Sequence, residues 1–415
     1  MAVPSVTAII NFSTGASFGQ AFVIGTGIFG TNILADSTSL VVDVSNQVDS
    51  IQTQRGRNAI ADQFQTGTLT MRIVDQNGDF NPQNTNSPYY GYLTPMRKIQ
   101  ISAAYQGVSY PIFAGFITGY NTTTPKFVGD VVYTTITAVD GMRLLQNALV
   151  TTITGASAGD DSGTRINQIL NTIGWPNSMR SIQTGNSTVQ NDPGTTRSAL
   201  AAAQTVQISE YGAFYIDPSG IVTFKNRNYC TKTPANTPVY FNDNGTQIPY
   251  FNAQWLLDDQ QIVNQASITA TGLATQTAVN TASVNKYFAH SYAQTDLLMQ
   301  TTTDAANYAL AYVASRAETT IRCDAITLDL YYANYDAGII AALSLDYFSP
   351  VVITTTQPNV VGTSTITKNL QVFGVMHKIT PNSWKTTFTT LEPIIDGFII
   401  GSSLYGVLGT NTLSY

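Results

Sequence analysis

The stretch between residues 55 and 91 constrains the fold of this chain more than any other segment, because its pattern predicts a strand followed by a turn. Leu69, Met71 and Ile73 alternate with polar residues, which is the period of a half-buried strand. The Asn-Gly pair at 77–78 suits the positive φ angles of a type I′ hairpin turn. The segment therefore predicts a strand, a tight hairpin turn and a proline-rich loop.

Composition indicates a folded chain with an unusual surface. The chain has 415 residues, which is enough for about two to four domains. Only 11% of its residues are charged, against roughly 25% in ordinary soluble domains, whereas 43% are hydrophobic. A surface with so little charge is typical of a protein that is buried in an assembly. A secreted β-rich protein is the alternative that composition leaves open.

Charge and cysteine content exclude several classes of protein. A net charge of −6 without a basic cluster argues against specific binding of nucleic acid through phosphate contacts. Cys230 and Cys323 make neither a disulfide framework nor a metal site on their own, and Cys323 is predicted to be buried. The first residues lack the pattern of a signal peptide, and the apolar segment 394–408 is too short to span a membrane. We therefore expect assembly in the cytoplasm and no membrane span.

Hydrophobic periodicity divides the chain into four parts and predicts a mainly β fold with an α+β insert. Residues 1–149 read as short strands rich in β-branched residues, which is typical of a barrel or a sandwich. Residues 150–238 contain two helical patterns, near 162–173 and 196–209, and then a hairpin. Strands return in residues 239–393, interrupted by a helix near 304–317, and residues 394–415 form a C-terminal arm.

The order of several short sequence words matches a known pattern. The words are Arg55-Gly-Arg57, Gly67-Thr68, Asn77-Gly-Asp-Phe-Asn-Pro82, Ser87-Pro-Tyr-Tyr-Gly91, Pro95-Met-Arg-Lys-Ile99, the strand with Phe113, Gly115 and Ile117, and the ending with Ala138, Asp140, Leu144 and Leu145. A strand with Val372, Gly374, Val375, His377 and Ile379 follows near the end, with a partner that ends at Leu391-Glu392-Pro393. Together these words resemble baseplate-hub-type minor tail proteins of tailed bacteriophages. The resemblance covers most of the chain and is strongest at 55–145 and 370–393.

This resemblance carries expectations about fold and function. It implies two small tail-tube-like β-barrels per chain, with the α+β insert between them. It implies a homotrimeric hub ring that closes the tail tube, lets DNA pass and joins the tube to a spike or central fibre. The expected partners are a second and third copy, a distal tail or tail-tube protein above, a spike or fibre protein below, and a tape-measure protein inside. The expected location is the tail tip of the virion.

Six residues are candidates for contacts between subunits: Arg55, Arg57, Tyr89, Tyr90, Tyr92 and Arg97. The loop that holds the three tyrosines contains two prolines and no basic residue, so it should lose little entropy on docking. The alternative is a surface loop that packs only on its own barrel. We also expect a ring lumen that is neutral or negative, because each lysine or arginine there would bind a DNA phosphate.

No combination of residues predicts catalysis, a cofactor or a metal site. The glycines at 25–30 fit a dinucleotide fingerprint, but a strand pattern rather than a helix follows them. The acidic residues at 75–79 begin like a calcium loop without its later glycine and glutamate. The pairs at 160–161 and 258–259 are adjacent acids rather than a catalytic dyad, and Asp161 suits a helix cap.

The two histidines also lack a catalytic context. His290 and His377 have no G-x-S-x-G serine to act with, so both are predicted to be structural. We expect a protein that is not an enzyme.

Two other functions remain open at this point. A host-binding adhesin for glycans would use exposed aromatic residues such as Tyr89, Tyr90, Tyr331 and Tyr332 to stack on sugar rings. A polysaccharide-degrading enzyme is the second alternative. Sugar release would favour the enzyme, glycan binding by an isolated monomer would favour the adhesin, and assembly into trimers would favour the hub.

Overall fold

The computed structural model describes residues 3–13, 40–58, 63–123, 131–232, 237–331, 336–357 and 364–392. The glycines at 25–30, Tyr332 and the expected C-terminal arm at 394–415 lie outside these residues.

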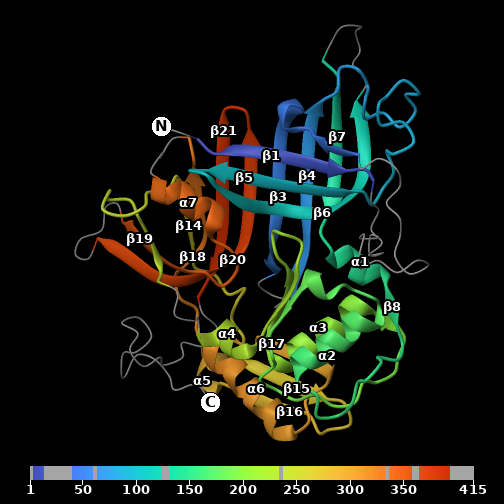
Figure 1. Cartoon of the computed structure of the whole chain (residues 1–415). Coiled ribbons are helices and arrows are strands. Elements are labelled where there is room, and N and C mark those ends of the chain that lie inside the picture. The colour runs from blue at the N-terminus through green and yellow to red at the C-terminus, as the bar shows by residue number, and fades with distance from the viewer. Residues whose placement is uncertain are drawn as a thin grey trace.

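A large sheet of 13 strands dominates the described part of the chain (Figure 1). In hydrogen-bonded order its main path runs through β14 (Asn252–Leu256), β18 (Arg322–Asp329), β21 (Ser383–Leu391), β20 (Thr365–Thr380), β3 (Val48–Asn58), β4 (Gln63–Val74), β7 (Tyr133–Val139), β6 (Val108–Thr123), β5 (Lys98–Tyr105), β1 (Ser5–Asn11) and β2 (Val41–Asp43). Off this path, β19 (Pro350–Thr356) pairs with β20 and with β13 (Val239–Asn242). A 3-10 turn at Ser45–Gln47 precedes β3. The prediction of a mainly β chain is confirmed.

The sheet turns a corner within β6. Residues 108–116 of this strand pair with β5, and residues 116–123 pair with β7. A bulge between Ile117 and Gly119 marks the turn. At Gly115 a Cβ atom would lie 2.3 Å from the carbonyl oxygen of Val139, so only glycine allows this close approach. As a result, β1 and β5 cross in front of β3 and β4 in Figure 1.

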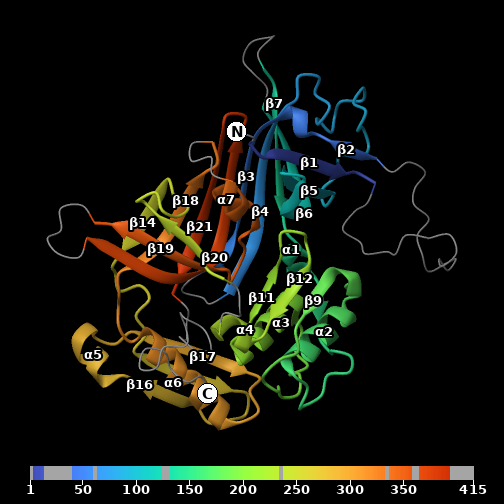
Figure 2. The same cartoon turned by 60° about the vertical axis from the view of Figure 1, so that its left-hand side comes forward.

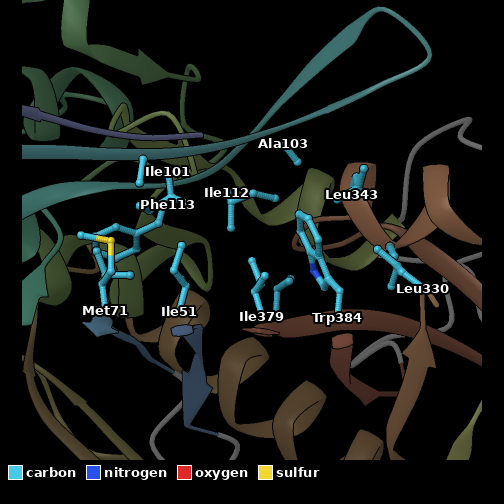
Figure 3. Packing of buried hydrophobic residues seen from close by; sticks show 14 of the residues in the cluster. Ile51, Met71, Ile101, Ala103, Ile112, Phe113, Leu330, Leu343, Ile379 and Trp384 are labelled. Carbon is cyan, nitrogen blue, oxygen red and sulfur yellow. The ribbon is translucent and has the colours of Figure 1, made fainter. Parts of the chain in front are cut away.

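The main hydrophobic core fills the space inside this fold of the sheet. Met71, Ile51, Ile101, Phe113 and Trp384 point toward one another from different strands in Figure 3, and each is at most 1% exposed. Full burial of such side chains stabilises the fold by roughly 1.5–3 kcal/mol each. The helix α7 (Asp336–Ser344) adds Leu343 to the same core.

The two expected β-barrels are not confirmed, because the strands of both halves of the chain join in one open sheet. β3 pairs with β20 over residues Ile51–Gly56 and Gly374–Ile379, and the main path ends at β14 on one side and β2 on the other. Gly56 lies opposite Gly374 in this pairing, and a Cβ on Gly56 would come within 3.3 Å of the Gly374 Cα. In two separate barrels, the backbone N–H and C=O groups of β3 and β20 would each pair within their own half of the chain. Here these groups pair with each other instead.

The type I′ hairpin predicted at 77–78 is wrong. Gly78 does have a positive φ of 67°, but β4 pairs with β3 and β7, and the next strand, β5, begins only at Lys98. The buried Asp75 carboxylate accepts hydrogen bonds from the Phe80 backbone N–H and the Thr134 hydroxyl. These bonds turn the chain into a long loop instead of a returning strand.

The α+β insert predicted by the helical patterns packs against one end of the large sheet (Figure 1). Within residues 150–238 its elements are α2 (Ser162–Thr172), a 3-10 turn at Asn177–Met179, β9 (Arg180–Ile182), β10 (Arg197–Ser198), α3 (Ala199–Glu210), β11 (Ala213–Ile216), β12 (Val222–Lys225) and α4 (Arg227–Lys232). The preceding α1 (Met142–Asn147) and β8 (Leu149–Val150) pack on the same core. The Asp161 side chain accepts from the Thr164 N–H at 3.1 Å, so the predicted cap of α2 is confirmed. The predicted hairpin is β11–β12.

A third core lies in a small unit inserted between β14 and β18. It consists of β15 (Gln265–Ala270), β16 (Gln276–Val279), α5 (Thr281–Tyr287), β17 (Ser291–Leu297) and α6 (Thr302–Arg316). The helix expected near 304–317 is α6, and Tyr308 and Tyr312 are on its buried face. Figure 2 shows this unit beside the insert, below the large sheet.

Candidate functional site

The loop at residues 79–92, which we call the tyrosine loop, is held in one conformation by its own side chains. The Asn84 amide donates to the carbonyl oxygens of Asn77 at 3.2 Å and Gly78 at 3.0 Å. The Ser87 hydroxyl donates to the Asp79 carbonyl and accepts from the Tyr89 N–H at 3.0 Å. Local side-chain bonds of this kind pre-organise a loop that has no regular secondary structure.

The three tyrosines of this loop face different ways. Tyr89 is tucked inward, with its ring 5.1 Å from Phe12 and 5.1 Å from Phe80 between centroids. Tyr90 is 50% exposed and Tyr92 is 37% exposed. The loop therefore uses one tyrosine as an internal anchor and presents the other two to solvent.

Arg97 connects the tyrosine loop to the start of β5. Its Nε donates to the Tyr92 carbonyl at 3.1 Å, and its side chain is half-buried. Near it, the Tyr120 hydroxyl is buried without a hydrogen-bond partner in the described part of the chain. Burial raises the pKa of Tyr120, and the positive charge of Arg97 lowers that pKa in part.

Arg55 and Arg57 lie elsewhere, on β3 where the sheet meets the insert; we call this place the arginine junction. The Arg55 guanidinium is 6% exposed and forms an ion pair with Asp346 at 2.7 Å. It also lies over the ring of Tyr347, with 5.1 Å from Cζ to the centroid. The Arg57 guanidinium lies over the Phe373 ring at 5.0 Å. Both side chains thus contact their own chain.

Two further acids face Arg55 at this junction. Burial raises the pKa of Asp140 to about 7, although its carboxylate accepts from the Gly67 N–H at 2.7 Å and the Met142 N–H at 2.9 Å. Burial also raises the pKa of Asp217, which lies in the β11–β12 turn of the insert. The charge of Arg55 lowers both pKa values in part. The buried guanidinium of Arg55 therefore faces three carboxyl groups: Asp140 after β7, Asp346 in the loop before β19, and Asp217 in the insert.

Only part of this arrangement is apparent from the sequence. Asp140 belonged to a word of the phage-tail pattern, which is the signal that pointed to it. Asp346 is 291 residues from Arg55 and carries no local signal. The structure brings Tyr89, Tyr90, Tyr92 and Arg97 together, and it separates them from Arg55 and Arg57.

The solvent-facing side of the central strands is mostly uncharged. We call it the neutral face, and it consists of Gln52, Gln54, Thr68, Thr70, Thr135, Thr137, Met376, Thr387 and Thr389. Charged side chains gather at one end of it, where Arg72 pairs with Asp49 at 2.6 Å and Lys378 lies opposite Lys385. Because side chains alternate along β3, Gln54 is on this face and Arg55 is on the buried one.

The paired acids and His377 form contacts within the fold. The Asp160 carboxylate pairs with Arg165 at 3.2 Å, and Asp258 pairs with Arg322 at 2.8 Å. His377 is buried in β20, where its Nδ1 lies 3.3 Å from the Trp384 Nε1 donor and 3.0 Å from the Thr386 hydroxyl. Burial lowers the pKa of His377 to about 3, so its imidazole is neutral.

Metal and membrane features are also absent within the described ranges. Among those residues no group of three or more His, Cys, Asp or Glu side chains is placed to hold a metal ion. In the same part of the chain, every helix is too short or too polar to cross a membrane.

Comparisons with known proteins give the class of the fold. The sequence matches no protein-family model, and it matches no curated protein. A tail protein from Neisseria meningitidis has a similar structure, with a TM-score of 0.57 over 94% of this chain and 97% of that chain at 9% identity. The 43 kDa tail protein of prophage MuSo2 from Shewanella oneidensis has a TM-score of 0.55 over 94% and 99% at 8% identity. The fold of this chain is that of phage tail proteins.

Proposed function

We propose that this chain is a structural component of a phage tail tip or baseplate. Three copies form a hub ring that closes the tail tube, joins it to a central spike or fibre and lets DNA pass. The observation that carries the proposal is the likeness to two tail proteins over 94% of the chain, which includes the sheet, the insert and the third unit. The order of the sequence words supports the hub assignment in particular.

The ring would use the two halves of the large sheet as tube-like units. Residues 1–149 supply β1 to β7, and residues 239–393 supply β13, β14 and β18 to β21. Three chains with two such units each would present six similar positions to a sixfold tail tube. The insert at 150–238 and the arm at 394–415 would then be accessory parts of the hub.

The tyrosine loop is the subunit contact that we propose. Tyr90 and Tyr92 are exposed aromatic side chains on a pre-organised loop, and Arg97 lies beside them. Aromatic and arginine side chains are enriched at the centres of interfaces. Arg55 and Arg57 would support this contact from a distance, by holding the sheet and the insert together.

The neutral face would line the lumen. Its threonine and glutamine side chains can form hydrogen bonds but carry no positive charge. They therefore do not bind DNA phosphates with release of counterions, as lysine and arginine do. A distal tail or tail-tube protein above, a spike or fibre protein below and a tape-measure protein inside complete the proposed set of partners. The buried neutral His377 and the paired acids support a protein without catalytic activity.

Electron microscopy of purified tails labelled with an antibody against this chain tests the proposal. Label at the distal end of the tail, and only there, is the expected result. Label along the tube or on the capsid would contradict the hub assignment. Binding of the isolated monomer to host glycans without any association with tails would favour the adhesin instead.

A further inference from the structure

Phe288 is the most exposed large hydrophobic side chain in the described part of the chain, with 83% of its surface open to solvent. It follows α5 directly, and its backbone has a φ of 67° and a ψ of −179°. This combination is almost restricted to glycine, because a Cβ atom crowds the neighbouring carbonyl groups. A phenylalanine at such a position is strained, and it gains no burial within its own chain.

The buried side chain of Asn264 holds Phe288 in this conformation. Asn264 is 0% exposed, and its amide nitrogen donates to the Phe288 carbonyl at 2.8 Å. Its amide oxygen accepts from the His290 N–H at 2.8 Å, and its amide nitrogen also donates to the Ser283 hydroxyl at 3.1 Å. The backbone on both sides of Phe288 is thus fixed, and the exposed ring is displayed by a rigid support.

An apolar groove lies on another side of the molecule, between the large sheet and the insert. Its volume is about 430 Å³, and its walls include Ile99, Phe116, Trp175 and Met179. Figure 2 shows α5 at one side of the molecule and the layer of β1, β5 and β6 toward the other. The groove and the Phe288 ring therefore belong to different faces of one chain.

Lys98 places a positive charge at the groove. Its side chain lines the groove, is half-buried, and forms no hydrogen bond or ion pair within the residues that the structure describes. Burial lowers the pKa of Lys98, as expected for an ammonium that has lost water without gaining a partner. The face of an aromatic ring attracts such a cation without adding a charge that must itself be desolvated.

We propose that Phe288 of one copy inserts into this groove of the next copy, with its ring against Lys98. The proposal rests on the proposed function, since it assumes that copies of the chain assemble. Because Phe288 and the groove are on different faces, their contact joins copies head to tail. Such contacts form a closed ring when the rotation between neighbouring copies adds up to a full turn. The cost of the strained backbone is then balanced by an aromatic anchor at the interface.

The substitution Phe288→Gly separates assembly from folding. Glycine suits the backbone of this position, so the thermal midpoint of the monomer should stay the same or rise. Loss of the anchor should raise the dissociation constant between copies roughly thirtyfold. Leu310→Ala is the matched control, because Leu310 is 59% exposed on α6 of the same unit and should leave assembly unchanged. Equal assembly of wild type and Phe288→Gly would overturn the inference.

Cross-linking locates the contact. A chain with Phe288→Cys, mixed with a chain with Ser219→Cys at the exposed rim of the groove, should form a disulfide between copies under mild oxidation. Leu310→Cys should not cross-link to Ser219→Cys, and the natural cysteines are both buried. Wild-type trimers without this cross-link would overturn the inference and leave the hub proposal standing. A wild-type chain that never associates, even in tails, would contradict the hub proposal itself.

Discussion

Arg55 stabilises the junction of sheet and insert through a buried charge. Its guanidinium is the partner of Asp346 at 2.7 Å, so replacement by methionine leaves that carboxylate without its cation. We expect Arg55→Met to lower the free energy of unfolding by about 3 kcal/mol, measured by urea denaturation. Arg72→Met removes an exposed ion pair with Asp49 and should cost less than about 1 kcal/mol. If the two variants lose similar amounts of unfolding free energy, the arginine junction stabilises the fold no more than an exposed ion pair does.

His377 should make stability depend on pH. Its pKa is lowered to about 3 in the folded chain, whereas an unfolded histidine titrates near 6.5. The unfolded state therefore binds more protons below about pH 6.5, and acid favours unfolding.

The measurement compares wild type with His377→Gln, which keeps a hydrogen-bond acceptor. Between about pH 7 and pH 5, the stability of wild type relative to the variant should fall by about 2 kcal/mol. The comparison is needed because Asp140, whose pKa is raised to about 7, changes stability in the opposite direction over the same range. A pH-independent difference between the two proteins would show that His377 is solvated and free to protonate.

Among the elements, the tyrosine loop combines an internal anchor with an exposed surface. The double substitution Tyr90→Ser and Tyr92→Ser should change the unfolding free energy of the monomer by no more than about 0.5 kcal/mol. The same variant should self-associate more weakly in sedimentation experiments, because both rings leave the proposed interface.

Tyr89→Ser is the contrasting variant within the same loop. It removes packing against Phe12 and Phe80 and should cost about 2–3 kcal/mol of monomer stability. If the double variant assembles like wild type, the loop is only a surface feature of its own sheet.

Element patterns were predictable from the sequence where the information is local. Alternation located the strand around Leu69, helical spacing located α6, and Asp161 marked the start of α2. The Asn-Gly turn at 77–78 was misread as a hairpin because the deciding bond comes from Thr134, on a distant strand. The pairing of β3 with β20 and the ion pair of Arg55 join residues that nothing in their local sequence connects.

At the scale of the whole molecule, the charge of the neutral face should decide whether the proposed ring binds DNA. The chain has a net charge of −6, and the neutral face carries hydroxyl and amide groups. We expect purified wild type to leave duplex DNA unretarded in gel-shift assays at physiological salt.

Adding charge to this face should create DNA binding. A variant with Thr68→Lys, Thr137→Lys and Thr389→Lys should bind duplex DNA, with an affinity that falls steeply as salt rises. Glutamine at the same three positions is the control for side-chain length and should not bind. Tight binding by wild type would contradict the assignment of this face to the lumen.

We propose that three copies of this chain form one hub. Sedimentation equilibrium of the purified full chain at micromolar concentration measures the mass of the assembly without assuming a shape. We expect a reversible equilibrium whose largest species has three times the mass of one chain. A chain that stays monomeric throughout the concentration range, or that stops at a dimer, would contradict it.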